Sequence, residues 1–371
     1  MKICVLTYQY PSKHDAYGGV FVKQLVDEWA RRGHLVIIAV PYNILYYKKY
    51  LKIYETYNVG NGKVVIYRPW YLSFSTFHIG KFCPTVFFRK VALRKIFRRM
   101  PAPDVVYGHF WGQAFEGYEY ARRNKLPLFV ASGESTISFR KTFQTEAFCN
   151  FVRGVVCVSS KNQEESVDLG LTTNDKCKVY PNAINNRLFR PLDKTNCRKS
   201  LGFREQDFII VFVGLFNHRK GIKRVSEAIK LNKEKKIFSL FIGRGDEDID
   251  CPNVLFKGCL NHDQIPVYLN AADVFVLPTL HEGCCNAIVE ALACGLPVIS
   301  SDRRFNDDVL NTTNSIRIDP ENVEELANAI AKLYDDLDLR KKMGKGALET
   351  AKDLTIEKRA EAIEIFMKDR L

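Results

Sequence analysis

Two glutamates, Glu282 and Glu290, stand eight residues apart in a stretch that joins an apolar strand to a helix. The helix is expected to open near Cys284 or Cys285 and to stop at Gly295. A loop before a helix leaves backbone N–H groups free, which favours an anion there. Eight helical residues span about 12 Å, so the two acids are too distant to share one proton. They could grip both ends of a diphosphate-linked ligand, although Glu290 as a core-edge acid paired with a base is the structural alternative.

Two adjacent cations, Arg219 and Lys220, follow the apolar strand expected at Phe208–Val213. They stand where a helix should begin. Cations at a helix N-terminus are unfavourable unless an anion lies nearby. The pair is therefore interpreted as a site for a diphosphate, and a surface pair of helix-start cations is the alternative.

Short β-branched runs alternate with amphipathic stretches of helix length, which is typical of doubly wound parallel α/β domains. A polar stretch over 181–194 interrupts the alternation and is interpreted as the segment between two domains. In open parallel sheets, ligands bind at the carboxyl ends of the strands. The expected strands are Ile3–Thr7, Leu35–Val40, Val64–Tyr67, Val105–Tyr107, Leu128–Ala131, Val155–Val158, Lys178–Tyr180, Phe208–Val213, Phe238–Ile242, Val254–Phe256, Val274–Leu277 and Val298–Ser300.

Composition narrows the class of protein. The chain has 371 residues, of which 46% are hydrophobic, so two domains can each bury a core. Its eleven cysteines form no C-x-x-C pair, which favours a reducing, cytoplasmic compartment. The apolar stretch at the N-terminus is too short for a signal peptide, and no run of 18 apolar residues occurs. We therefore expect neither secretion nor insertion into a membrane.

Three segments together resemble the family 4 glycosyltransferases. Residues 282–298 match the family pattern E-G-x-x-N-x-x-x-E-A-L-A-C-G-x-P-V closely, and residues 272–278 and 212–221 are also similar. The resemblance implies a retaining, metal-independent enzyme with the GT-B fold, in which two Rossmann-like domains face each other across a cleft. It implies an acceptor-binding domain over 1–190, a donor-binding domain over 191–353, and a helix over 354–371 that packs back toward the first domain.

The resemblance also implies roles for the residues of the second domain. Arg219 and Lys220 would stabilise the charge that grows on the departing diphosphate. Glu282 would hold hydroxyls of the transferred sugar, and Glu290 would hold those of the ribose. The donor-binding residues so implied are Gly18, Gly19, Gly214, Gly243, Gly283, Cys284, Cys285, Asn286 and Glu290.

In the first domain, Gly18-Gly19 lies between a strand and a helix, where a missing Cβ lets the backbone approach a phosphate. His109 ends the strand that begins at Val105, and in similar enzymes such a histidine contacts the donor sugar or helps to arrange the acceptor. Glu134 follows the next strand, and an acceptor-side role is the hypothesis for it. A plain turn at the glycines and a partly buried structural histidine are the alternatives.

No cofactor or metal is expected. Gly243-Arg244-Gly245 lacks the third glycine of a dinucleotide fingerprint, which argues against NAD. The acidic stretch Asp246-Glu247-Asp248 follows a strand, but we interpret it as a solvated loop because the similar family works without metal. Asn182 resembles a residue of the family's hinge motif and is expected to be structural.

Residues 45–100 hold twelve of the chain's lysines and arginines, one acid, Glu55, and fourteen aromatic residues. Such a segment suits an anionic membrane surface, and it would also suit single-stranded nucleic acid or an ordinary solvated face. The absence of a nucleic-acid motif disfavours nucleic acid as a partner. If the segment binds the inner face of the membrane, the acceptor would be a lipid-linked glycan of a cell-surface polysaccharide or lipopolysaccharide.

The sequence therefore predicts transfer of a sugar from a nucleoside diphosphate sugar, UDP-linked in preference to GDP-linked, to a hydroxyl of a glycan or lipid-linked acceptor. Two alternatives remain open. A nucleotide-sugar epimerase would share the fold and would convert the donor without an acceptor. A catalytically silent nucleotide-sugar-binding or membrane-adaptor protein would bind the donor without turnover.

Overall fold

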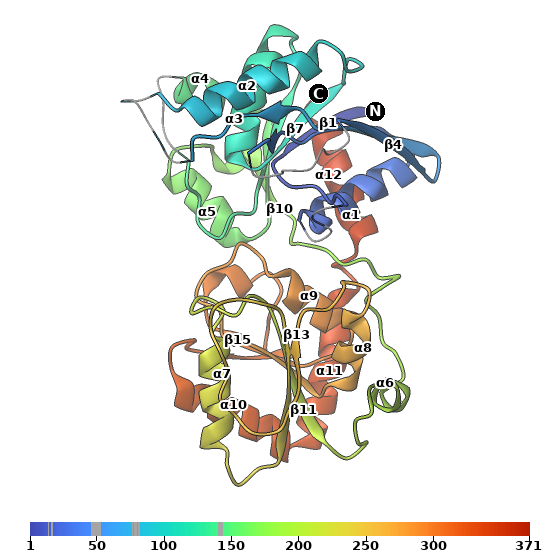
Figure 1. Ribbon diagram of the computed structural model, residues 1–371, viewed down its shortest axis with the longest axis vertical. Helices are drawn as coiled ribbons and strands as arrows, with labels where there is room; N and C mark the ends of the chain where they lie inside the picture. Colours follow the sequence, from blue (N-terminus) through green and yellow to red (C-terminus); the bar gives the residue numbers. More distant parts are fainter. Residues whose placement is uncertain are drawn as a thin grey trace. The chain divides into compact units, whose positions relative to one another are not determined.

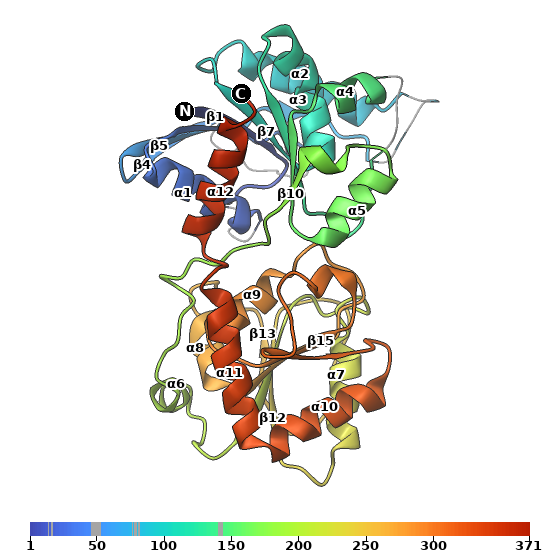
Figure 2. The same cartoon turned by 180° about the vertical axis from the view of Figure 1, so that it is seen from behind.

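The chain forms two α/β units in the computed structural model (Figures 1 and 2). The structure describes residues 1–371 except positions 14, 16, 17, 46–52, 76, 78, 79, 81 and 140–143. The first unit comprises Met1–Tyr180 together with Ile356–Leu371, and the second is the continuous segment Pro181–Thr355.

The boundary after Tyr180 corrects the expected boundary at residue 190. Backbone bonds explain the difference, because the segment that follows Tyr180 is tied to the second unit. The Ile184 N–H donates to the Leu354 carbonyl at 2.9 Å, and the Asn270 amide donates to the Arg190 carbonyl at 3.1 Å.

The first unit is built on an eight-stranded sheet of order β10-β9-β8-β7-β1-β2-β5-β4, in which only the β4–β5 pair is antiparallel. Strands β3 and β6 form a separate parallel pair. The strands are β1 Lys2–Thr7, β2 Leu35–Ala39, β3 Tyr42–Asn43, β4 Tyr54–Val59, β5 Gly62–Tyr67, β6 Trp70–Tyr71, β7 Val105–His109, β8 Leu128–Ser132, β9 Gly154–Cys157 and β10 Cys177–Val179. The helices are α1 Val20–Arg31, α2 Pro84–Phe97, α3 Trp111–Arg123, α4 Thr145–Phe151, α5 Ser160–Asp168 and α12 Ile356–Lys368, with a 3₁₀ turn, η1, at Asn174–Lys176.

The second unit has a six-stranded, all-parallel sheet of order β13-β12-β11-β14-β15-β16. Its strands are β11 Phe208–Val213, β12 Ile237–Ile242, β13 Val254–Gly258, β14 Val274–Leu277, β15 Val298–Ser301 and β16 Ser315–Ile318. Its helices are α6 Lys194–Leu201, α7 Ile222–Leu231, α8 Ile265–Ala271, α9 Asn286–Ala293, α10 Val323–Asp335 and α11 Leu337–Ala351, with a 3₁₀ turn, η2, at Arg304–Asn306.

Helix α12 completes the first unit although it follows the second in sequence. It lies beside α1 in both views (red and blue in Figures 1 and 2). The buried Trp29 indole N–H donates to the Ala360 carbonyl at 3.1 Å, and Arg32 Nε donates to Glu364 at 2.8 Å. Phe366 packs edge-on against Phe129 of β8. The last helix therefore covers apolar surface that α1 and the sheet would otherwise expose.

Each sheet changes winding direction once near its centre. In the first unit the chain runs from β1 outward through β2 and then returns to β7 on the other side of β1. In the second unit it runs from β11 through β12 and β13 and then returns to β14. The carboxyl ends at such a switch point form a crevice where ligands of open α/β sheets bind.

Most predicted strands match the structure, but strands β3, β4, β6 and β16 were not foreseen. The hairpin of β4 and β5 extends the first sheet, whereas only Val64–Tyr67 was expected there. Strand β16 closes one edge of the second sheet. No helix among the described residues has both the length and the apolar character to cross a bilayer.

Candidate functional site

Strand β14 and helix α9 hold the loop that carries Glu282. The loop runs from the end of β14 at Leu277 to Cys285, whose extended backbone caps the first turn of α9. Helix α9 therefore begins at Asn286, slightly later than predicted, and Cys294 caps its end before Gly295. Cys284 and Cys285 are both buried, so these vicinal thiols fill space beneath the loop.

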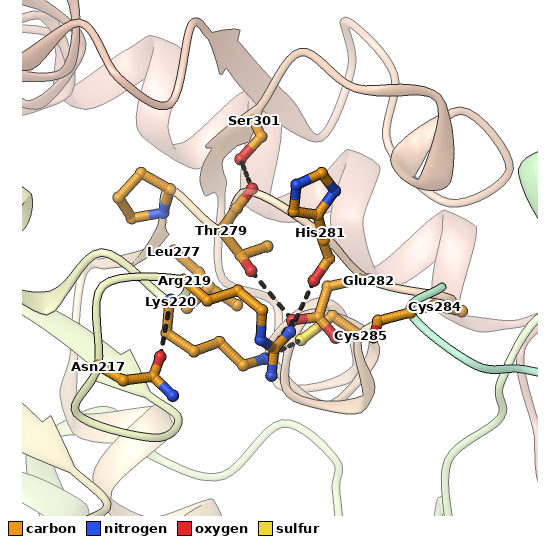
Figure 3. A network of polar contacts seen from close by, with 12 residues as sticks. Asn217, Arg219, Lys220, Leu277, Thr279, His281, Glu282, Cys284, Cys285 and Ser301 are labelled. Carbon is orange, nitrogen blue, oxygen red and sulfur yellow. Dashed lines mark hydrogen bonds and ion pairs between the residues drawn. The ribbon is translucent and has the colours of Figure 1, made fainter. Parts of the chain in front are cut away.

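Glu282 is the centre of a polar cluster (Figure 3). Its Oε1 lies 2.6 Å from Arg219 Nη1 and 2.6 Å from Lys220 Nζ, and it accepts a hydrogen bond from the Thr279 hydroxyl at 3.0 Å. Arg219 also donates to the His281 carbonyl at 2.6 Å. Two cations share one carboxylate, so the cluster carries a net charge of about +1 at the carboxyl end of the sheet.

The loop after β11 brings Arg219 and Lys220 to this place. The Leu280 N–H donates to the Arg219 carbonyl at 2.8 Å, which ties the loops after β11 and β14 together. Asn217 accepts from the Lys220 N–H at 3.0 Å and shapes the turn before α7. These two strands flank the switch point of the second sheet, so the cluster occupies the expected ligand crevice of this unit.

Lys220 is 8% exposed, and its Nζ also lies 3.7 Å from Cys285 Sγ. Burial acts to lower the pKa of Lys220, but Cys285 and Glu282 outweigh it and raise the pKa above its ordinary value. Burial likewise raises the pKa of the Cys285 thiol. Lys220 is therefore a cation at neutral pH.

Glu290 has a partner that the sequence did not reveal. Its Oε1 lies 2.9 Å from His262 Nε2, and the His262 ring packs edge-on against Phe189 at 4.9 Å. His262 follows β13, far from Glu290 in sequence, and no local pattern marks it. The contact matches the structural alternative of an acid paired with a base, and it also fixes the direction of the carboxylate.

Gly214 and Gly243 directly follow the neighbouring strands β11 and β12. Gly243 has a φ of +149°, and a Cβ there would lie 1.8 Å from the Gly214 carbonyl oxygen. A glycine is thus required at 243 by close packing of the two backbones. Their donor contacts stay a prediction, as do those of Gly283 and Asn286.

The hinge residue Asn182 contacts the same loop. Its side-chain amide donates to the Cys284 carbonyl at 2.9 Å. This bond agrees with the structural role expected for Asn182, and it anchors the segment after Tyr180 to the loop that carries Glu282.

The remaining predicted site residues belong to the first unit, at the switch point between β1 and β7. Gly19 caps α1 with a φ of +74°, and a Cβ there would lie 2.3 Å from the Gln9 carbonyl oxygen. The Gly18 N–H donates to the Asp15 carboxylate at 2.8 Å. The loop is therefore a tight turn in which the glycines meet other parts of the same loop.

His109 is buried at the end of β7. Its ring lies 5.3 Å from that of Phe21 and 4.6 Å from that of Phe110. Burial, and to a smaller degree the charge of Arg359, lowers the pKa of His109 to about 3. The imidazole is therefore neutral at physiological pH and can accept or donate one hydrogen bond without carrying charge.

Glu134 caps the N-terminus of α3. Its carboxylate accepts from the Trp111 N–H at 3.3 Å and from the Gly133 N–H at 3.0 Å. Burial raises its pKa to about 7, although these N–H groups act in the opposite direction. The contacts give Glu134 a structural role in the first unit, and an acceptor-side role stays a hypothesis.

The acidic loop after β12 is engaged with lysines. Asp248 pairs with Lys257, and Asp250 pairs with Lys230 at 2.6 Å. Among the described residues, no group of three or more His, Cys, Asp or Glu side chains is arranged to hold a metal ion.

Two family models match the chain, and between them they reach both units. The model described as Glycosyltransferase Family 4 matches residues 18–187, and that described as Glycosyl transferases group 1 matches residues 193–350.

Curated relatives are similar over long stretches. An uncharacterized glycosyltransferase of Methanocaldococcus jannaschii is 27% identical, over 92% of this chain and 90% of its own length. TuaC of Bacillus subtilis, named as a teichuronic acid biosynthesis glycosyltransferase, is 28% identical over 90% and 89%. The N,N'-diacetylbacillosaminyl-diphospho-undecaprenol alpha-1,3-N-acetylgalactosaminyltransferase of Campylobacter jejuni is 27% identical over 54% and 56%.

Solved structures share the fold. A sucrose-phosphate synthase from Thermosynechococcus elongatus superposes with a TM-score of 0.78 at 17% identity, covering 100% of this chain and 98% of its own. HepE of Anabaena, solved in complex with UDP and glucose, gives 0.72 at 16% identity, with complete coverage of both chains.

The two parallel sheets, the switch-point cluster and these likenesses define a glycosyltransferase with the GT-B fold. Both family models describe glycosyltransferases. The chain belongs to the family 4 glycosyltransferases.

Proposed function

We propose that the chain transfers a sugar from a nucleoside diphosphate sugar to an acceptor hydroxyl with retention of anomeric configuration and without a metal ion. The observation that carries this proposal is the cluster of Arg219, Lys220 and Glu282 at the carboxyl ends of β11 and β14. Two cations at one point suit a diphosphate, and the carboxylate between them suits sugar hydroxyls.

UDP is the favoured nucleotide of the donor, with GDP as the alternative. HepE, which shares the fold, has been solved with UDP and glucose bound. In this chain, Glu290 would hold the ribose hydroxyls, with His262 fixing the direction of its carboxylate. Backbone N–H groups from Gly283 to Asn286 would face the sugar and phosphate at the start of α9.

The proposed reaction takes place on one face of the sugar. The bond between the anomeric carbon and the diphosphate oxygen breaks while a bond forms to the acceptor oxygen, and the acceptor proton passes to the departing diphosphate. Arg219 and Lys220 stabilise the negative charge of that leaving group, which is a role that a metal ion plays elsewhere. Glu282 positions the sugar, so the protein contributes orientation and charge more than a strong base.

The acceptor is proposed to be a glycan or lipid-linked glycan of the cell envelope. TuaC is named for teichuronic acid biosynthesis, and the Campylobacter relative is named for a diphospho-undecaprenol substrate. His109 and the Gly18–Gly19 loop would assist from the first unit.

Part of the basic segment 45–100 could meet a membrane. Arg68 and Arg89 are excluded, because they pair inside the unit with Glu55 and Glu116. Lys48, Lys49, Lys52 and Lys81 lie outside the described residues. Among the described residues of the segment, the exposed basic side chains are Lys63, Arg94, Lys95, Arg98 and Arg99, and the exposed aromatic ones are Tyr54, Trp70, Phe74, Phe77, Phe82 and Phe87.

Flotation with vesicles tests this membrane surface. We expect the chain to float with vesicles that contain anionic lipid and to lose that binding at high salt, because screening weakens the attraction. Equal flotation with neutral and anionic vesicles would reject an electrostatic contact.

The first test of the function is calorimetric titration of the protein with UDP, GDP, CMP and NAD in the absence of metal. We expect one nucleoside diphosphate to bind and Arg219→Ala to abolish that binding. Lys235→Ala is the matched control, because Lys235 pairs with Asp335 in another part of the same unit. Failure of every nucleotide to bind a folded chain would overturn the donor site.

Turnover separates the alternatives. Glu282→Ala should remove most transfer while the fold stays intact, and near-normal transfer would refute the assignment of Glu282. An epimerase would convert the donor with no acceptor present, which analysis of the products would reveal. A silent binding protein would bind the donor and release it unchanged.

A further inference from the structure

A cavity lies in the first unit, at the carboxyl ends of β1 and β2. Its volume is about 350 Å³, within the range of small-ligand pockets. It is separate from the Glu282 cluster, which belongs to the second unit. The side chains that matter for its chemistry are Tyr8, Gln9, Asp15, Asn43, Tyr71 and Arg89.

Aromatic rings and one arginine form a prearranged wall of this cavity. The Arg89 guanidinium lies 4.1 Å from the centre of the Tyr8 ring and 5.6 Å from that of Tyr71. Arg89 Nε donates to the buried Glu116 at 2.6 Å, and the Tyr8 hydroxyl donates to the same oxygen at 2.8 Å. These contacts fix Tyr8 and Arg89 before any ligand arrives, so a ligand that stacks on the wall need not order it.

Among the described residues that line the cavity, no positive charge is left uncompensated. Its two arginines, Arg68 and Arg89, are neutralised by Glu55 and Glu116, neither of which lines the cavity. Asp15 adds a further carboxylate to the wall. A phosphate or carboxylate would gain little here and would meet the charge of Asp15.

We propose that this cavity binds a neutral sugar ring of the acceptor. The inference rests on the proposed function, since it names the acceptor class for that activity. The faces of tyrosine rings suit the C–H faces of a sugar, and Gln9, Asn43 and Asp15 supply donors and acceptors for its hydroxyls.

The test uses the full chain and a panel of immobilised oligosaccharides. Neutral members carry glucose, galactose or N-acetylglucosamine, and each is matched by an acidic member that carries a uronic acid or a phosphate. UDP binding is measured in parallel for every variant, so that damage to the donor site is detected separately.

Tyr71 is the residue to change, because its ring is half-buried in the wall and its backbone pairing in β6 survives substitution. We expect Tyr71→Ala to weaken retention of neutral glycans about tenfold and Tyr71→Phe to keep most of it, since the ring makes the contact. Tyr54→Ala is the matched control, because Tyr54 is an exposed tyrosine of the same unit that does not line the cavity. All three variants should bind UDP as the unaltered chain does.

Three results would overturn the proposal. These are retention of acidic glycans alone, equal retention by Tyr71→Ala and the unaltered chain, and no retention of any glycan by a chain that binds UDP. Loss of UDP binding with neutral glycans still retained would refute the donor assignment instead, and it would leave the cavity's role supported.

Discussion

Replacement of Glu282 by glutamine should weaken the fold and strengthen nucleotide binding at the same time. The side chains of Glu282 and Lys220 are 13% and 10% exposed, so Lys220 loses its compensating carboxylate in a nearly buried place. Removing one partner of a buried pair costs about 3–5 kcal/mol, and the exposure of Arg219 together with the amide's remaining hydrogen bonds lowers this to about 2 kcal/mol. For a unit of this size, that corresponds to a fall in Tm of about 4–8 °C.

The same substitution raises the charge of the cluster from about +1 to about +2. A diphosphate then meets two cations that no carboxylate offsets. At an effective dielectric of about 20, one charge at about 5 Å contributes roughly 3 kcal/mol, and solvent near Arg219 reduces this to about 1–2 kcal/mol. We therefore expect UDP to bind Glu282→Gln about tenfold more tightly than the unaltered chain, although transfer is lost.

Calorimetry gives the affinity, and thermal unfolding with and without UDP gives the stability. Saturating UDP should restore Tm more strongly in the variant, because ligand binding stabilises in proportion to the logarithm of [L]/Kd. Asp335→Asn is the control, since it removes an exposed partner of Lys235 and should change stability by less than about 1 kcal/mol. Unchanged Tm together with equal or weaker UDP binding would refute this account of the cluster.

Three further outcomes are expected. His262→Ala should weaken UDP binding several-fold, because it frees the Glu290 carboxylate from its partner. Calorimetry should show unchanged binding of inorganic pyrophosphate, which lacks the ribose, and equal losses of affinity for both ligands would contradict a positioning role for His262. The pKa of Glu134 is about 7 in the folded state in place of the ordinary 4.5, so the folded state keeps the proton to higher pH and the free energy of unfolding falls as pH rises between these values. Glu134→Gln should remove about 3 kcal/mol of that decline, measured by denaturant unfolding across this pH range. Plots of unfolding free energy against pH that run parallel for the variant and the unaltered chain would contradict this expectation. Gly243→Ala should lower Tm by several degrees, because its Cβ would meet the Gly214 carbonyl, and an unchanged Tm would show that the backbone yields there.

Sequence was sufficient for the features that depend on local pattern. Buried parallel strands are continuous apolar runs, so β11 and β14 were found almost residue for residue. Because parallel strands end at one edge, the residues after them could be placed together, and the structure does bring Arg219, Lys220 and Glu282 into contact.

Contacts between distant segments were beyond local pattern. His262 meets Glu290 only because β13 and α9 belong to one folded unit, and nothing in its neighbours marks it. The sequence analysis grouped Arg89 with the basic residues of a surface segment, but Arg89 forms an ion pair with the buried Glu116 of α3. A charged residue's type does not reveal its burial, so the basic segment looked more exposed than it is.

The placement of α12 has a consequence for synthesis of the chain. The first unit is begun by the first 180 residues but is finished only by Ile356–Leu371, after the entire second unit has left the ribosome. Until then, the α1 surface around Trp29 has no cover. The second unit is continuous in sequence, so it can fold while the first unit still lacks α12. Newly made chains should therefore pass through a stage in which the second unit is folded while the first still exposes apolar surface of the kind that chaperones bind.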